Sequence, residues 1–452
     1  MLLRYPFFLL LHLLWIADLS TTTAQTGSTI QIGPIEQTCS CLEAQLDVNA
    51  APNARVARLT EFWRVVDTSR IVLIGELDHR DGSTLALKND LIEHFTARYD
   101  STVFIFESGM ATIAEVDYRV RHQHDSIYKH LGYLSTPRAG AITRAYDSLA
   151  VKLQRVYDTH PGTFVFAGLD VLETVGYLEL LLERIIPDTF VLHLNSKRTL
   201  TKRAAIESLV RPWQYHPFED AAAERAHYAR LDTARNGRIV DSLLRQLVIP
   251  THEYAVLQSV RNNETLQLEW IDRKPGAEYA AANTIAKRDS LLAANAAYYI
   301  DKYPNHKVLI SVSNFHAAKI LPPYRETSGR NLRAAGSYLA ERYGSSLVSF
   351  ATLRYTGASG AWRYDSRDYR YRRVMKKKRS SLEYLLAEQC QSLGFLIFSN
   401  QLAQQRFRMH ATFSESPNFE WSRAFDGVFF IHTMQTDVGM HYPHRFGIDF
   451  PD

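Results

Sequence analysis

The sequence predicts an α/β fold, in which a mostly parallel sheet is flanked by helices and a helical subdomain is inserted between the third and fourth strands. Two observations support this. Short apolar runs rich in Val, Ile and Phe recur along the 452-residue chain. They are continuous rather than alternating, which is typical of strands buried on both faces. Helical patterns lie between the runs, as expected for a sheet whose strands run parallel.

Six of these runs are predicted to be strands. Between the third and the fourth, from about Tyr177 to Tyr299, the pattern is almost purely helical. That stretch is too long for one crossover helix, so we place a helical insertion at about residues 177–299. The predicted strands are residues 71–76, 102–109, 163–170, 307–316, 346–355 and 427–433.

The first residues have the layout of a secretory signal peptide. Arg4 precedes an apolar run from Pro6 to Ile16, and small polar residues follow up to Ala24. The run is shorter than the ~20 apolar residues that span a bilayer, so no stable membrane span is expected once the signal is removed. An uncleaved anchor is the alternative. We expect an exported protein, periplasmic or secreted, with a signal peptide over 1–24, a leader over 25–55 and one domain over 56–452.

Composition is that of an ordinary globular protein, with 46% hydrophobic and 22% charged residues. A formal net charge of +4 lacks the polybasic character of a nucleic-acid-binding protein, so no nucleic-acid partner is expected. One basic segment, residues 363–381, is either a solvated loop or a contact with an anionic surface or substrate.

Three cysteines are of interest in an exported chain. Cys39 and Cys41 are too close in sequence for a relaxed mutual disulfide. Either one of them joins Cys390, which would tie the amino terminus to the carboxy-terminal part, or all three are unpaired.

Polar side chains follow four of the predicted strands at the point where each strand ends. In open α/β sheets, ligands bind outside the carboxyl ends of the strands. Any one of these residues could be a helix cap or a turn former. Because four separate strands all end in such residues at the same edge of the sheet, we expect a functional site there. The residues are Glu76 and His79 after the first strand, Glu107 in the second, Asp170 in the third, and Asn314 and His316 after the fourth.

Lys88 adds a cation to this edge. If a helix starts near Ser83, the spacing places Lys88 in the same apolar stripe as Leu91 and Phe95, facing the sheet. A snorkelling lysine is one interpretation. The other is an ion pair with Glu76 or Glu107.

These residues together resemble the erythromycin esterase family. The similarity lies in Gly75-Glu76-x-x-His79 with a basic residue nine positions on, in Phe106-Glu107-Ser108-Gly109, in Gly168-x-Asp170, and in the helix with Arg288-Asp289 and Asn295 before the histidine strand. It covers roughly residues 70 to 432, nearly all of the mature chain.

The resemblance implies a hydrolase that cleaves a small-molecule ester or lactone and needs no metal or other cofactor. It implies that His79 is the general base, that Glu76 and Glu107 orient the imidazole and water, that Lys88 replaces a family arginine and that His316 assists. Asp170, Arg288 and Asn314 are expected to bind substrate. The chemistry is reasonable, because histidine titrates near neutral pH and a neighbouring carboxylate fixes its tautomer.

Three positions depart from the family pattern. Asp78 and Arg80 flank the first histidine where the family has Ser or Thr and Gly, and Ser313 replaces a second histidine. Activity on a substrate other than a macrolide is therefore expected. Two alternatives remain: a metal-dependent hydrolase with Glu76, His79, Glu107 and His316 as ligands, and a non-catalytic binding protein.

Overall fold

The computed structural model of the chain describes residues 25–32, 35–42, 56–78, 81–130, 144–171, 175–195, 198–210, 233–246, 255–260, 278–322, 332–361, 370–373, 379–399, 404–411 and 417–435. The predicted signal peptide, His79, Arg80 and most of the basic segment lie outside the described residues.

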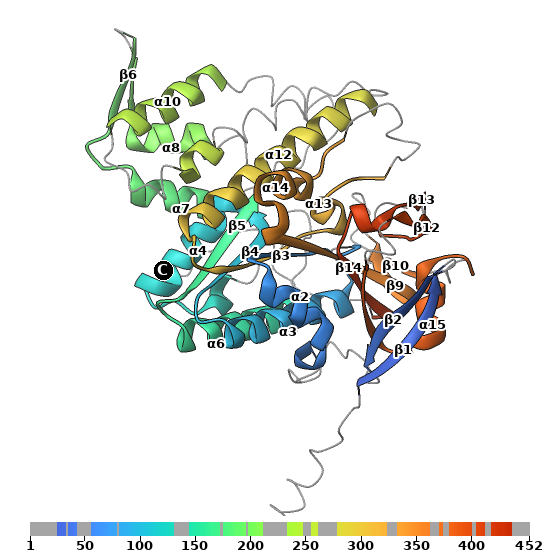
Figure 1. Cartoon of the computed structure of the whole chain (residues 1–452). Helices are drawn as coiled ribbons and strands as arrows, with labels where there is room; N and C mark the ends of the chain where they lie inside the picture. The colour runs from blue at the N-terminus through green and yellow to red at the C-terminus, as the bar shows by residue number, and fades with distance from the viewer. Residues whose placement is uncertain are drawn as a thin grey trace, which may run out of the picture.

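One large sheet forms the centre of the molecule (Figure 1). Six of its described strands are parallel and occupy neighbouring positions. They match the six predicted strands, which confirms the α/β class with a mostly parallel sheet. In spatial order these strands are β14 (Gly427–Met434), β9 (Leu347–Ala361), β3 (Ile71–Ile74), β8 (Lys307–Ser311), β4 (Thr102–Gly109) and β5 (Phe164–Asp170).

The parallel strands are buried on both faces, as their continuous apolar runs predict. In β3, Ile71 and Leu73 join one hydrophobic cluster, whereas Val72 and Ile74 join the other. The first cluster includes helices α7 (Val175–Ile185), α12 (Glu278–Lys302) and α14 (Ala335–Tyr343). The second includes α2 (Thr60–Thr68), α3 (Gly82–Arg98) and α6 (Arg144–Thr159), which lie on the opposite side of the sheet (Figure 1).

Antiparallel strands extend the sheet beyond β14. β11 (Leu393–Ile397) pairs with β14 and with β2 (Ile35–Leu42), and β2 pairs with β1 (Gln25–Ile32). The β1–β2 hairpin falls in the segment expected to be a leader, and it is joined to the sheet edge. Cys390, just after α15 (Leu382–Gln389), is disulfide-bonded. The alternative in which all three cysteines are unpaired is therefore wrong, and the side chains of Cys39 and Cys41 lie outside the described residues.

The described part of the segment between β5 and β8 is largely helical and also contains a two-stranded hairpin that its pattern does not predict. The hairpin consists of β6 (Val191–Asn195) and β7 (Arg198–Thr201). Helices α8 (Lys202–Val210) and α10 (Thr233–Gln246) lie beside it at one end of the molecule (Figure 1). None of the described helices has the length and apolar character needed to cross a bilayer.

Shorter elements complete the described chain. They are η1 (Val56–Arg58), α4 (Met110–His122), η2 (Ile127–His130), α13 (Asn314–Ala317), η5 (Gly344–Ser346), β10 (Arg370–Arg373), β12 (Phe407–Arg408), β13 (Asn418–Phe419) and η7 (Trp421–Arg423).

Gly75 lies at the carboxyl end of β3, where three strands are held close together. Its N–H donates to the carbonyl of Phe350 at 2.8 Å, and its carbonyl accepts from Oγ1 of Thr352 at 2.7 Å. A Cβ at this position would lie 2.2 Å from Oδ1 and 2.7 Å from Cα of Asn314. Glycine is therefore required here for space, because a backbone atom cannot move away easily.

We expect Gly75→Ala to lower the free energy of unfolding by about 1–3 kcal/mol, the usual cost of overpacking a close contact. Urea unfolding followed by circular dichroism measures it. The matched control is Gly162→Ala, where a new Cβ would meet nothing within 4 Å among the described residues. If both variants unfold at the same urea concentration as the wild type, the contact with Asn314 is not restrictive.

Candidate active site

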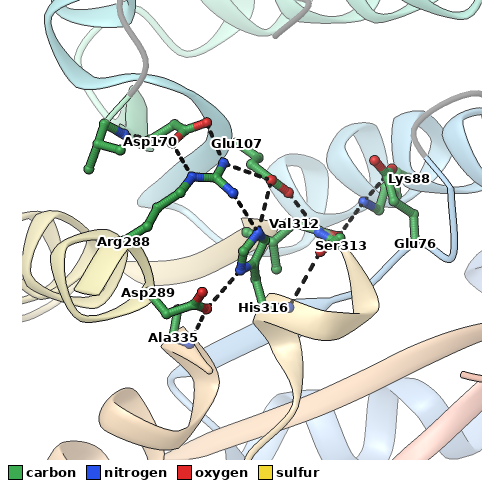
Figure 2. Close-up of polar contacts among 11 residues, drawn as sticks. Glu76, Lys88, Glu107, Asp170, Arg288, Asp289, Val312, Ser313, His316 and Ala335 are labelled. Atoms are coloured by element: carbon green, nitrogen blue, oxygen red, sulfur yellow. Dashed lines mark hydrogen bonds and ion pairs between the residues drawn. The ribbon is translucent and has the colours of Figure 1, made fainter. Parts of the chain in front are cut away.

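Ionisable side chains from separate strands and from the helical insertion meet at the carboxyl edge of the parallel sheet (Figure 2). Glu107 lies near the end of β4, and Asp170 is the last residue of β5. His316 is in α13, which begins shortly after β8 ends. Arg288 and Asp289 approach from α12 (Figure 2). The structure thus brings together residues that the sequence places 27 to more than 200 positions apart.

The His316 ring is buried, with a polar neighbour on each nitrogen. Nδ1 is 2.7 Å from Oδ1 of Asp289, which also accepts a hydrogen bond from the backbone N–H of Ala335 at 2.7 Å. Nε2 is 3.1 Å from Nη1 of Arg288 and 3.4 Å from Oε1 of Glu107. An ionised Asp289 only accepts, so Nδ1 carries a proton and Nε2 is the nitrogen that gains or loses one.

The charges around His316 favour its protonated ring. Burial alone would lower the pKa of His316, but the carboxylates of Asp289 and Glu107 outweigh burial and raise it. Arg288 opposes this rise, because its positive charge disfavours a second positive charge on the ring. The charge of Arg288 is matched by Asp170, so the two carboxylates prevail. Once protonated, Nε2–H has Oε1 of Glu107 as its acceptor.

Arg288 and Asp170 form a two-point ion pair. Nε of Arg288 donates to Oδ1 of Asp170 at 3.1 Å and Nη2 donates to Oδ2 at 2.7 Å. Burial would raise the pKa of Asp170, but the guanidinium lowers it below its usual value. Asn295 supports the end of β5 by donating to the carbonyl of Leu169 at 3.0 Å. Both members of the pair are predicted to bind substrate; in this structure they hold each other beside His316.

Glu107, on β4, contacts the segment that follows β8 and carries His316. Its Oε2 accepts the backbone N–H of Ser313 at 2.7 Å, and its Oε1 is 3.5 Å from Nη2 of Arg288. Ser313 caps α13, because its hydroxyl accepts from the backbone N–H of His316 at 3.4 Å. Ser313 therefore shapes the short helix that carries His316.

Glu76 and Lys88 form a second buried pair at the same edge (Figure 2). Nζ of Lys88 is 2.7 Å from Oε2 of Glu76 and donates to the carbonyl of Val312 at 2.9 Å. Lys88 is 4% exposed, so it does not snorkel to solvent, and the predicted pairing with Glu76 is present. The α3 stripe that contains Lys88 faces the sheet as its spacing predicts.

Asn314 is predicted to contact substrate, but its side chain is engaged inside the fold. Its Nδ2 donates to the carbonyls of Thr352 at 2.9 Å and Ala411 at 2.8 Å, while its Oδ1 accepts the N–H of Thr352 at 3.0 Å. It is 1% exposed. The sequence shows an amide after a strand, but its partners lie far along the chain and carry no sequence signal.

The sequence prediction omits Asp289 from the site residues. A usable signal was present, because Asp289 shares a helix face with Leu292, Ala293 and Ala296. A carboxylate in an apolar stripe is the same kind of anomaly that singles out Lys88. Among the described residues, which exclude His79, no group of three or more His, Cys, Asp or Glu side chains is arranged to hold a metal ion.

We expect Lys88→Met to lower the free energy of unfolding by about 3–5 kcal/mol, because it leaves the buried Glu76 carboxylate without its cation. The double variant Lys88→Met/Glu76→Gln should recover much of this loss. Urea unfolding at neutral pH measures both. The control is Lys129→Met, which breaks an exposed pair with Asp125 and should cost at most about 1 kcal/mol. Equal losses in the single and double variants would contradict an ion pair as the source of the effect.

The geometry described above can be compared with known proteins. The family model for erythromycin esterase matches residues 97–434. No curated protein matches the chain. Three solved structures share its fold. A mutant of the erythromycin esterase EreC in its open conformation is 14% identical, with a TM-score of 0.62, over 88% of this chain and 98% of that one.

The other two structures are similarly distant in sequence. A succinoglycan biosynthesis protein is 13% identical, with a TM-score of 0.63, over 87% of this chain and 94% of that one. A protein from Bacillus cereus is 17% identical, with a TM-score of 0.58, over 88% and 95%. The TM-scores show a common fold, while the family match covers most of the sequence and supports hydrolase activity. The chain belongs to the erythromycin esterase family.

Proposed function

We propose that this protein is an exported hydrolase that opens the ester or lactone bond of a small molecule by activating water. The observation that carries the proposal is the convergence of Glu107, His316, Asp289 and the Arg288–Asp170 pair at one sheet edge. An imidazole held between two carboxylates, in a buried setting, is suited to proton transfer near neutral pH. The Glu76–Lys88 pair completes this edge on the side of β3.

In the proposed reaction, His79 removes a proton from water while the water oxygen attacks the ester carbonyl carbon. The role of His79 rests on the family resemblance, and Glu76, three residues before it, is the carboxylate proposed to orient it. The carbonyl π electrons move to oxygen and give a tetrahedral oxyanion. When the carbonyl re-forms, the bond to the alcohol oxygen breaks and that oxygen takes up a proton.

His316 is the proposed source of that proton. Its protonated form is stabilised by Asp289 and Glu107, and its Nε2 is the nitrogen that exchanges a proton. Asp289 acts on the substrate only through His316, which makes it a positioning residue. Lys88 compensates the charge of the buried Glu76 carboxylate and holds it in place through their contact.

Ser313 supports a substrate other than a macrolide. The family's antibiotic esterases carry a second histidine at this position, whereas here a serine hydroxyl caps α13. The edge therefore offers one imidazole fewer to the substrate. The disulfide at Cys390 supports export, since disulfides persist in oxidising compartments and are rare in the cytosol.

We expect the purified mature chain to hydrolyse at least one member of a panel of small esters and lactones, macrolides included. His79→Ala should lower kcat by about a hundredfold or more, because general-base catalysis contributes about that much. The control His94→Ala, a partly exposed histidine on α3, should leave turnover unchanged. Turnover that disappears with a chelator and returns with added metal would favour the metal-dependent alternative. If the folded chain cleaves no member of the panel, the proposal that it is an enzyme is contradicted.

We expect Asp289→Asn to shift the alkaline limb of the pH–rate profile to lower pH. If protonated His316 donates the proton, activity is present below its pKa and is lost as pH rises through it. Asp289 raises that pKa, so removing its charge lowers the pKa and moves the loss of activity to lower pH. The profile is measured beside an NMR titration of the His316 ring. If the pKa of the His316 ring falls but the alkaline limb of the pH–rate profile stays at the same pH, His316 is not the acid.

A further inference from the structure

Asp81 occupies the N-cap position of α3 without acting as a cap. Aspartate is favoured at this position because its carboxylate accepts the backbone N–H groups of the first turn. Within the described chain, its side chain makes no such hydrogen bond. It is fully buried, and its Oδ1 is in close contact with Nη1 of Arg354 instead. Helix capping therefore does not explain this residue.

Arg354 lies on the part of β9 that continues beyond the end of β3. Ile74, the last residue of β3, is paired with Phe350, four residues before Arg354. Thr352 and Arg354 are two residues apart on this strand, so they share one face of the sheet. Oγ1 of Thr352 donates to the carbonyl of Gly75 at 2.7 Å. One strand thus fastens the end of β3 through Thr352 and the start of α3 through Arg354.

Burial of the Asp81–Arg354 pair costs stability. Burial raises the pKa of Asp81 to about 8, the charges of Asp78 and Glu76 add to the rise, and Arg354 opposes it. Oδ2 of Asp81 and Nε of Arg354 are both buried and have no hydrogen-bond partner among the described residues. Apolar residues of similar volume would often stabilise a fold as well as such a pair does. A role in stability alone is therefore a weak explanation for it.

The location of the pair provides a better explanation. Seven residues, from Gly75 to Asp81, lie between β3 and α3 in the sequence, and they include the proposed base. β3 ends two residues before Glu76, and Lys88 lies six residues after the first residue of α3, Gly82. Any sliding of α3 along the sheet would separate Lys88 from Glu76, which are in contact at 2.7 Å.

We propose that Asp81 and Arg354 are a pair of positioning residues that fixes the start of α3 against β9 and so holds the Glu76–Lys88 contact in place. The catalytic consequence rests on the proposed hydrolase function. The structural consequence does not. Because the pair acts as a unit, each residue depends on the other for its effect.

The test compares Arg354→Met, Asp81→Asn and the double variant with the wild-type mature chain. Asp81→Asn keeps the shape of the side chain, which guards against a failure to fold, and Arg354→Lys keeps the charge. Hydrogen–deuterium exchange is measured on peptides that span Ile71 to Leu85. Arg70→Met is the matched control, since Arg70 is a part-buried arginine next to the opposite end of β3 and donates to the carbonyls of Ile300 and Tyr303.

We expect exchange in these peptides to rise at least about tenfold in each single variant, while peptides from β5 and α12 stay as in the wild type. The double variant should exchange no faster than either single variant, Arg354→Lys should restore part of the protection, and Arg70→Met should leave these peptides unchanged. On a substrate that the wild type cleaves, kcat should fall by about ten- to a hundredfold with little change in KM, as for a small misplacement of catalytic groups.

Three results would overturn the proposal. Unchanged exchange from Ile71 to Leu85 would show that the pair restrains nothing. A uniform rise across the whole chain would show an effect on global stability only. Raised local exchange with an unchanged kcat would remove the link to the site. A wild type without turnover would contradict the proposed hydrolase, and the exchange comparison would still decide whether the pair holds α3.

Discussion

The close contact between Gly75 and Asn314 is the constraint on which the rest of the site depends. Glycine leaves the space into which Asn314 fits, and the amide of Asn314 then ties β9 to the segment at Ala411. The backbone N–H of Asn314 also donates to the carbonyl of Glu76 at 2.6 Å. The ends of β3 and β8 and the middle of β9 are thereby fixed relative to one another. A rigid edge of this kind lets short side chains hold charges within hydrogen-bond distance without a large loss of conformational entropy on binding.

Charges alternate along this edge, and each is compensated by a neighbour. Lys88 matches Glu76, Arg288 matches Asp170, and Asp289 with Glu107 stabilises a protonated His316. In a buried setting an unmatched charge would change its protonation state instead of remaining ionised. The arrangement therefore favours a protonated His316, whose pKa the neighbouring carboxylates raise, before any substrate binds. The helical insertion takes part directly, because α12 supplies both Arg288 and Asp289.

Much of the fold can be predicted from local patterns, and what cannot be predicted depends on distant contacts. The six parallel strands can be predicted from the sequence, because both of their faces are buried and their residues therefore form continuous apolar runs. Lys88 is visible because a cation interrupts an apolar helical stripe. The β1–β2 hairpin has polar residues throughout, such as those around Cys39 and Cys41, and gives no such run. The partners of Asn314 lie 38 and 97 residues away, so its role inside the fold has no local sign.

The most direct test of the account is the identity of the atom that attacks the ester. A single turnover is run in heavy-oxygen water, with the protein in excess over an ester that it cleaves. The reaction is stopped by lowering the pH, and the masses of the intact protein and of the carboxylic acid product are measured by mass spectrometry. Activation of water by histidine predicts one heavy oxygen in the acid product and an unmodified protein mass. A protein that carries the acyl group, or a product without the label, would show that a side chain such as Glu107 attacks first, and would contradict the account.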